Sequence, residues 1–401
     1  YKGYAFERAD LELETTPEGK LGPRQEENKS SKGMDRMIHL KKISINQLIC
    51  LVILTQVGVS VLSLPFTQSQ YSGYDSWMSI LIGGVVAQVL ILIIYQLGKR
   101  YGNRPLPEYI SSIIGKRLGS VLIFLFAVYC TESSLMVVVS YSDVLDRWIL
   151  FETPWFVVIG ISVAVAAYIA TSTLRSMSVI TQMIMLMFLV CFAIIVISGM
   201  GKGDWRHFLP VGTHGIGPII KGALPAFWLY AGYELLLYVF PFVKCRRQKD
   251  ILIAMSVANG FTTFFYVLIS VIVTYNFGES QLKSIPEPMV FILRKFRWPV
   301  VQSLDILFLT LWLSVTTVTV YVYLFLSARY LAFVGGKEIR NHPLLVWILA
   351  IVCFAAGLWL HNRQWLFKFS NYHNTATAIM IAIVPTVLLL VSLARGKAAG
   401  G

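Results

Sequence analysis

Two carboxylates lie inside long apolar runs of this 401-residue chain, and both could do chemistry there. Glu132 lies between Tyr129 and Met136 in one run, and Glu234 follows Gly232 by two residues in another. A carboxylate inside a membrane is energetically costly unless it is protonated, paired or hydrated, so each is a candidate functional residue. Three roles are open to each of them: binding the ammonium of a solute, relaying a proton, or capping free backbone N–H groups.

Small and polar residues interrupt two apolar segments at corresponding places. The segment 48–66 reads LICLVILTQVGVSVLSLPF, and the segment 219–243 reads IIKGALPAFWLYAGYELLLYVFPFV. The interrupting residues considered for a binding site are Gln56, Gly58, Ser60, Gly232 and Glu234. A helix broken in lipid frees backbone groups that water cannot reach, so the break persists only where it lines a buried site. A matched pair of breaks therefore predicts a transporter-type site, whereas either break alone is better explained as a simple kink.

The free backbone groups of such breaks suggest the kind of solute. Exposed N–H groups suit a carboxylate and exposed C=O groups suit an ammonium or another cation, so an amino acid fits both. Phe227 flanks the second break, where its ring could gate the site. Thr317 and Tyr321 belong to a polar stripe in another apolar run and are candidate walls. The alternative for this stripe is hydrogen bonding between neighbouring helices.

The elements that must position these residues are membrane helices. Hydrophobic residues make up 56% of the chain and charged residues 14%, against roughly 25% charge in soluble domains, and the mean hydropathy is +0.67. The sequence predicts ten spans of about 30 Å each. Their predicted limits are 47–66, 76–97, 118–142, 154–171, 178–199, 217–243, 250–275, 302–328, 343–360 and 375–394. The basic residues fall between the spans, most densely in 98–117 and 244–250, which the positive-inside rule places in the cytoplasm.

Ten spans divide into five and five, with the two interrupted segments as the first span of each half. This predicts an all-α polytopic membrane protein with the five-plus-five inverted repeat of the LeuT-type fold, broken first and sixth helices and both termini in the cytoplasm. Residues 1–36 are polar and predict a disordered leader, either a fusion or cloning remnant or a native extension. Residues 37–395 form the permease-like membrane domain, and 396–401 form a flexible tail.

Several function classes have no support in the sequence. The net charge of +13 raises the question of nucleic acid, but the basic residues form no aromatic-studded soluble face, so no nucleic-acid partner is expected. The five cysteines and six histidines show no ligand spacing, so neither a metal nor another cofactor is expected. No phosphate loop or nucleophile elbow is present, so we expect no enzyme.

A series of short motifs follows a characteristic order along the chain. The motifs are Ile43–Ser44 with Gln47, Gln56–Gly58, Leu62–Pro65, Gly73–Trp77, Leu97–Tyr101, Ile114–Gly119, Gly232–Glu234 and Pro241. Their order and spacing resemble the endospore germination permease-like proteins, which are the B subunits of GerA-type germinant receptors in the amino acid–polyamine–organocation (APC) superfamily. The segment 294–299, RKFRWP, departs from the acidic–Arg pattern common in the family. The resemblance covers about residues 37–395.

The resemblance implies a nutrient sensor of the spore inner membrane that works with an A-type membrane subunit and a C-type lipoprotein. It places the pocket at the first break, near Tyr129, near Leu229, and at Thr317 and Tyr321. We therefore expect a subunit that binds a small germinant such as an amino acid and signals to its partners to start germination. The alternatives are an ion-coupled amino-acid permease and a structural scaffold with a vestigial pocket, because fold alone does not decide function.

Overall fold

The computed structural model describes most of the chain after residue 41. The described residues are 42–102, 104–201, 203–209, 211–212, 215–296, 303–335, 342–360 and 362–396. Residues 43–401 form one compact unit, separate from residues 1–42, and the description below concerns this unit alone. The predicted leader, 1–36, and all but the first residue of the predicted tail, 396–401, lie outside the described residues.

Helices account for nearly all of the described unit. The first half comprises β1 (Ile43–Ser44), α2 (Ile45–Gln56), η1 (Val59–Leu62), α3 (Leu64–Ser72), η2 (Gly73–Asp75), α4 (Ser76–Arg100), α5 (Leu106–Ile114), α6 (Lys116–Trp148), α7 (Trp155–Ala170) and α8 (Leu174–Gly199). The second half comprises η3 (Trp205–Phe208), α9 (Ile216–Trp228), η4 (Tyr233–Leu235), α10 (Leu236–Val239), η5 (Phe240–Phe242), β2 (Val243–Lys244), α11 (Gln248–Asn276), α12 (Glu279–Leu282), α13 (Pro288–Lys295), α14 (Leu304–Val334), α15 (His342–Trp359), α16 (Arg363–Ala378), η7 (Ile379–Ile383) and α17 (Val384–Ala394).

Seven of the described helices are long and apolar enough to cross a membrane, and an eighth candidate is the bent pair that spans Ile216–Trp228 and Tyr233–Phe242. Two shorter apolar helices, α2 and α7, add to these. Nine of the ten predicted apolar segments overlap one of these helices or the bent pair, whereas 47–66 runs across α2, η1 and the start of α3. The helical class predicted from composition is thus confirmed.

The structure differs from the prediction at the last segment. The sequence placed its start at residue 375, whereas α16 begins at Arg363. The part of α16 before residue 375 is polar, so hydropathy could not detect it. The start of α16 is fixed by the Asn362 side chain, which accepts a hydrogen bond from the Gln364 N–H at 2.9 Å. A five-residue π-helix, η7, then separates α16 from α17.

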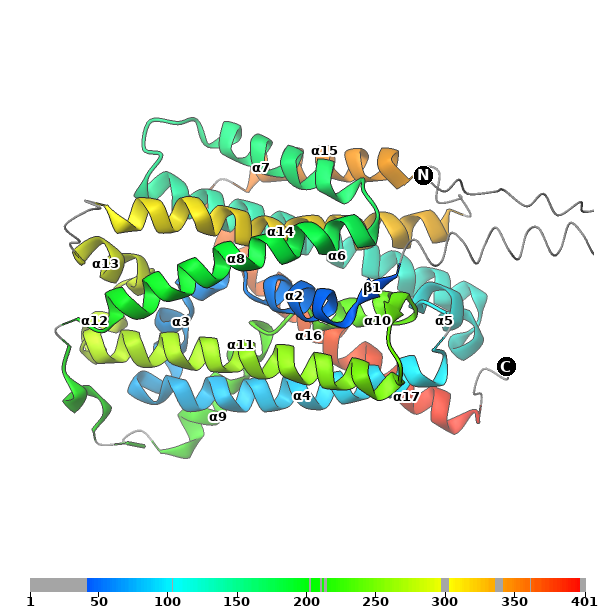
Figure 1. Ribbon diagram of the computed structural model, residues 1–401, viewed down its shortest axis with the longest axis horizontal. Coiled ribbons are helices and arrows are strands. Elements are labelled where there is room, and N and C mark those ends of the chain that lie inside the picture. The colour runs from blue at the N-terminus through cyan, green and yellow to red at the C-terminus, as the bar shows by residue number, and fades with distance from the viewer. Residues whose placement is uncertain are drawn as a thin grey trace, which may run out of the picture. The chain divides into compact units, whose positions relative to one another are not determined.

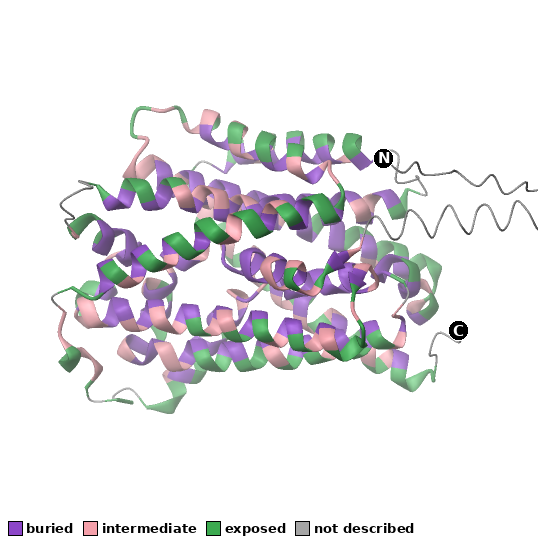
Figure 2. Cartoon of the chain, in the orientation of Figure 1, coloured by how far each residue is buried: buried purple, intermediate pink, exposed green. Residues whose placement is uncertain are grey.

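The interrupted elements lie in the middle of the bundle. In Figure 1, α2 and α10 are flanked by α11 and α4 on one side and by α6 and α14 on the other. Helix α14 is buried on nearly every side, with Trp312 and Tyr321 among its fully enclosed side chains. Figure 2 shows the complementary pattern, in which the outer faces of the peripheral helices are exposed. Those exposed faces are apolar, as expected of surfaces that meet lipid.

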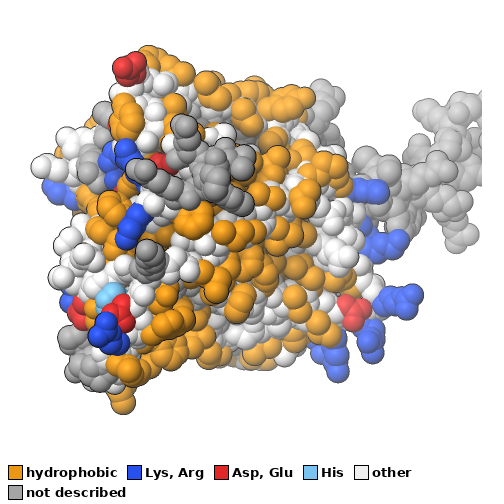
Figure 3. Space-filling view, turned by 60° about the vertical axis from the view of Figure 1, so that its left-hand side comes forward, with side chains coloured by type: hydrophobic (Ala, Val, Ile, Leu, Met, Phe, Trp, Pro, Cys, Tyr) orange, Lys and Arg blue, Asp and Glu red, His pale blue; other side chains and the backbone are white. Residues whose placement is uncertain are grey.

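Charged side chains mark the two ends of the bundle. Figure 3 shows hydrophobic side chains over the middle of the visible face and Lys and Arg side chains gathered toward its ends. At one end, the Arg100 guanidinium donates to the Ser392 carbonyl at 3.2 Å and the Arg395 guanidinium donates to the Ile113 carbonyl at 2.6 Å. At the other end, both carboxylate oxygens of Asp75 accept from the Gly212 N–H, at 3.1 and 3.0 Å. These contacts fix the ends of the helices that surround the interrupted elements.

Candidate functional site

The first break separates α2 from α3. Helix α2 ends at Gln56, the Val57 N–H donates to the Ile53 carbonyl at 2.8 Å, and the Gly58 N–H donates to the Gln56 carbonyl at 3.0 Å. A short 3-10 turn, η1, follows before α3 begins with Pro65 in its first turn. Proline lacks an N–H and suits the start of a helix, so the local sequence ends one helix and begins another. The predicted first break is confirmed.

The second break separates α9 from η4 and α10, with a bend of 46°. Pro225 lies inside α9, and Gly232 takes φ +128°, a backbone conformation that other residues rarely adopt. Pro241 is the second residue of the following 3-10 turn, η5. Beyond the breaks, β1 and β2 form a two-residue parallel pair, which joins Ile43 to Val243. The predicted second break is therefore confirmed, and this strand pair joins the chain before the first break to the chain after the second.

The two breaks contact each other directly. The Gln56 side-chain amide donates to the Tyr230 carbonyl at 3.0 Å, across 174 residues of sequence. Helix α11 supplies the remaining partners: the Thr262 hydroxyl donates to the Gln56 side-chain oxygen at 2.8 Å, and the Tyr266 hydroxyl lies 2.8 Å from the Gln56 carbonyl and 3.1 Å from the Leu229 carbonyl. Carbonyl groups that the breaks release from helical bonding thus find donors on side chains.

Glu234 lies at the centre of the second break with 4% of its surface exposed. One carboxylate oxygen accepts from the Tyr323 hydroxyl at 2.6 Å and from the Tyr129 hydroxyl at 3.1 Å. The other oxygen accepts from the Gly232 N–H at 2.6 Å. The carboxylate therefore caps a freed backbone N–H and joins the break to α6 and α14 at the same time. Of the three roles open from the sequence, capping is the one that these contacts match.

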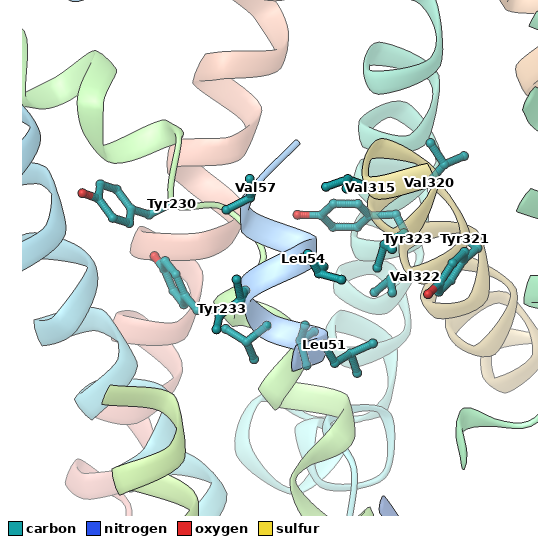
Figure 4. Packing of buried hydrophobic residues seen from close by; sticks show 14 of the residues in the cluster. Leu51, Leu54, Val57, Tyr230, Tyr233, Val315, Val320, Tyr321, Val322 and Tyr323 are labelled. Carbon is teal, nitrogen blue, oxygen red and sulfur yellow. The ribbon is translucent and has the colours of Figure 1, made fainter. Parts of the chain in front are cut away.

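Thr319 of α14 performs the matching task at the first break. Its hydroxyl lies 3.3 Å from the Leu54 carbonyl and 3.2 Å from the Thr55 carbonyl, at the end of α2. Figure 4 shows Tyr323, one turn further along α14, pointing toward α2, while Tyr321 turns away. One face of α14 therefore holds both breaks through hydroxyl groups.

Glu132 lies beside this network and not within it. Its carboxylate contacts the His373 ring nitrogen Nδ1 of α16 at 3.0 Å. The His373 ring is parallel to the Tyr129 ring, with centroids 6.5 Å apart. Glu132 thus has a charged or hydrogen-bonding partner, His373, on α16. Tyr129 contacts both the His373 ring and the Glu234 carboxylate, so it lies between the two carboxylates.

The structure brings together some of the predicted site residues. Those in or directly bonded to the network at the breaks are Gln56, Gly58, Tyr129, Leu229, Gly232 and Glu234. Phe227 is buried beside the second break, and Ser60 is half-buried in η1. Thr317 donates to the Leu313 carbonyl of its own helix at 2.7 Å. The Tyr321 hydroxyl lies 2.6 Å from the Thr181 hydroxyl of α8, so the structure does not bring Tyr321 to either break.

Residues outside the predicted set take those places. They are Thr262, Tyr266, Thr319, Tyr323 and Tyr230. His373 is a further residue outside the predicted set, and it contacts Glu132 beside the network. Thr319 and Tyr323 are spaced by four residues, as Thr317 and Tyr321 are, but lie two positions further along the helix. The two pairs therefore share a helix and a spacing and lie on different faces, and Thr319 and Tyr323 form the pair that bonds to the breaks.

The arrangement offers hydrogen-bond acceptors and neutral donors at mid-bundle. The carboxylate and the break carbonyls can accept from an ammonium, while tyrosine and threonine hydroxyls can donate or accept. Within the described ranges, no group of three or more His, Cys, Asp or Glu side chains is placed to hold a metal ion. The chemistry available to these described residues is hydrogen bonding, with the Glu234 carboxylate and the break carbonyls as the acceptors.

Comparisons with known proteins cover most of the chain. Residues 42–366 match the family described as spore germination protein, Spore_permease. The chain is 23% identical to spore germination protein GerQB of Bacillus cereus over 351 residues, which is 86% of this chain and 94% of that protein. It is 23% identical to spore germination protein YndE of Bacillus subtilis (strain 168) over 361 residues, or 89% of this chain and 98% of that one.

Solved structures with a similar fold are manganese transporters. A single-residue mutant of the Eremococcus coleocola manganese transporter superposes with a TM-score of 0.57 at 12% identity, covering 86% of this chain and 76% of that one. The same transporter in complex with an aromatic bis-isothiourea substituted compound gives a TM-score of 0.57, also at 12% identity, and covers 87% and 76% of the two chains. At this identity the likeness concerns the fold and not the solute.

Proposed function

Because this chain belongs to the spore germination protein family of germinant-receptor B subunits, we propose that it is the solute-sensing subunit of such a receptor. The family consists of permease-like membrane proteins, which are typically not enzymes. We propose that a small germinant, such as an amino acid, binds between the two breaks. The A-type membrane subunit and the C-type lipoprotein are the proposed partners, and the inner membrane of the spore is the proposed location.

The topology that we propose has ten spans. The eight candidates include α3 and α4 together as Leu64–Arg100. When α3 is assigned with α2 to the first span, α4 remains as the second span, and counting the shorter α7 as a span gives ten. The ten spans then divide into five and five, with the breaks at the first and sixth, and the fold likeness to a transporter agrees with this division. An even number of spans places both termini on the same side, and the basic loops favour the cytoplasm.

The observation that carries the proposal is the direct bonding of the two breaks. Gln56 bonds to the Tyr230 carbonyl, and Glu234 joins the second break to α6 and α14. A solute ammonium has only donors, and it can donate hydrogen bonds to the same carboxylate and carbonyls. It would therefore compete with the side-chain donors of the protein for these acceptors. Binding would thereby favour a different arrangement of the broken helices, and this shift between two states would pass to the partner subunits and lead to ion release.

The receptor function is testable in spores. Deleting the gene should remove the response of spores to one class of small solute, and a restored copy should return it. The panel should include amino acids, sugars and nucleosides, with release of spore cations as the readout. Spores that keep every response after deletion of this gene, in a strain without related receptors, would contradict the proposal.

A matched pair of tyrosine substitutions separates ligand sensing from packing. Tyr323→Phe removes a 2.6 Å hydrogen bond to the buried Glu234 carboxylate, and such bonds to charged groups contribute about 1.5–3 kcal/mol. Because the solute ammonium would compete with this bond for the carboxylate, we expect the solute concentration for half-maximal response to fall about tenfold or more. Tyr321→Phe removes only the bond to Thr181, so it should lower stability by about 1 kcal/mol and leave that concentration within about twofold. A larger change in this concentration for Tyr321→Phe than for Tyr323→Phe would place the pocket on the other face of α14.

A further inference from the structure

A polar stripe runs along the exposed face of α16. Its members are Gln364, Lys368, Asn371 and Thr375, all exposed and spaced at i, i+4, i+7 and i+11. This spacing places them on one face of a helix. The opposite face packs inward, where Thr377 is buried and His373 contacts Glu132. The stripe is therefore the side of α16 that the rest of the described unit leaves uncovered.

Part of the stripe lies deep in the membrane. Glu132 is equally far from the two ends of α6, and its partner His373 lies only two residues from both Asn371 and Thr375. Gln364 lies roughly 16 Å from Thr375 along the helix axis, toward the outer end of the helix. Gln364 and Lys368 can reach the interface, and Lys368 lies 5.1 Å from the Trp365 ring centre. Asn371 and Thr375 remain at a depth where lipid tails offer no hydrogen bonds.

The stripe is not explained by a water-filled passage. Exposed apolar side chains flank it on both sides: Phe367 is 64% exposed and Tyr372 is 74% exposed. Those flanks are suited to lipid, so the stripe between them is on the outer surface of the bundle. Within the described residues, no hydrogen bond involves the Asn371 side-chain amide, and the Thr375 hydroxyl donates to the Asn371 carbonyl at 3.1 Å. Polar groups in this setting normally bond to another membrane helix.

We infer that this stripe docks a transmembrane helix of a partner subunit that carries hydrogen-bonding side chains and an acidic residue near its outer end. The inference rests on the proposed receptor function, which requires a membrane partner. Lys368 supplies the only formal charge among the four stripe residues, so the complementary partner is acidic. A two-fold contact between copies of this chain would bring one Lys368 toward another and is disfavoured.

The same helix is connected to the candidate site. The Tyr233 hydroxyl, next to Glu234 in the second break, donates to the Ile381 carbonyl of η7 at 3.2 Å. A π-helical turn leaves carbonyls less regularly bonded than an α-helix and commonly occurs at functional places. A rearrangement of the second break would therefore move the turn that follows α16. That movement would shift the position of the stripe that contacts the partner.

Site-specific photo-crosslinking tests the docking surface. The full chain, with a benzophenone amino acid at position 371 or 375, is co-expressed in membranes with the A-type subunit. Positions 383 and 387 serve as controls, because Ile383 and Val387 are exposed apolar residues at and beyond the end of η7. We expect adducts with the A-type subunit at 371 and 375 to exceed those at the controls by about fivefold or more. Adducts with a second copy of this chain, or none above the controls, would overturn the inference.

A double variant gives an independent readout. Asn371→Leu with Thr375→Val makes the deep half of the stripe apolar without changing the buried face, so thermal unfolding in detergent should match the wild type. The amount of A-type subunit that co-purifies should fall about fivefold or more. If the wild type binds this subunit and the double variant binds it equally well, the stripe is not the docking surface. If the wild type does not bind it at all, both the stripe and the proposed receptor assembly fail.

Discussion

Replacing Glu234 by Gln should raise the solute concentration needed for half-maximal spore response by about 100-fold or more. The carboxylate accepts from the Tyr323 hydroxyl, the Tyr129 hydroxyl and the Gly232 N–H. A glutamine keeps the shape but has one oxygen acceptor and no negative charge, so it cannot pair with a solute ammonium. A hydrogen bond to a charged group contributes about 1.5–3 kcal/mol, and the upper end of this range corresponds to the expected change.

The matched control for this change is Glu152→Gln. Glu152 is exposed in the connection between α6 and α7, so its substitution should leave the response unchanged. The measurement is the dose response of spores that carry the variant as their only copy, using whichever solute triggers the wild type. A normal dose response for Glu234→Gln would show that the carboxylate is not part of the sensing site.

The second large effect concerns Gly232, which the structure holds at φ +128°. A Cβ added there would lie 3.0 Å from the Gln56 backbone nitrogen and 3.1 Å from the Thr55 carbonyl carbon. Both obstacles are backbone atoms of the other break, so neither can move cheaply. We expect Gly232→Ala to lower the free energy of unfolding by about 2 kcal/mol or more, because strain and close contact add together.

Gly58→Ala is the control in the first break. Gly58 has φ −100°, and its added Cβ would meet the Thr319 hydroxyl at an ordinary 3.6 Å. The free energy of unfolding of this variant should lie within about 1 kcal/mol of the wild-type value, because a glycine replacement at a tolerated position changes stability by no more than about this amount. Chemical denaturation of both variants in the same detergent checks the pair. Equal stability of the two alanine variants would contradict the close approach of the breaks.

The helices and the two breaks were predictable from the sequence because their signals are local. Long apolar runs define the spans, and glycine and proline mark the interruptions at Gly58 and Gly232. The face of α14 that meets the breaks was not predictable in the same way. This helix is buried on nearly every side, so the apolar residues carry no period that would fix which polar residues point to the breaks. The prediction named Thr317 and Tyr321, whereas Thr319 and Tyr323 bond to the breaks in the structure.

Other parts of the site depend on contacts between distant segments. Glu234 meets tyrosines that are 105 and 89 residues away in the sequence, and Gln56 meets a carbonyl 174 residues away. A single sequence does not indicate such pairings. The first half of α16 was missed for a different reason, because its polar composition is opposite to that of a typical span. The segment that hydropathy overlooked carries the proposed docking stripe.

The fold likeness to a transporter leaves sensing and transport as the two competing mechanisms. Both require a solute to bind between the breaks, but only transport requires the site to open to each side in turn. Direct bonds between Gln56 and the Tyr230 carbonyl and between Glu234 and two helices favour a site whose occupancy is read by the surrounding bundle. The distinction can be measured on the chain alone.

The most direct test is the amount of labelled solute retained by this protein in liposomes, with and without an ion gradient. The panel comprises amino acids together with a sugar and a nucleoside, and the Glu234→Gln protein serves as the binding-deficient control. We predict retention near one solute per protein for at least one compound, independent of the gradient and lost in the control. Retention far above one per protein that collapses with the gradient would show transport and contradict the sensing mechanism. Equal retention by the wild type and Glu234→Gln would contradict the site itself.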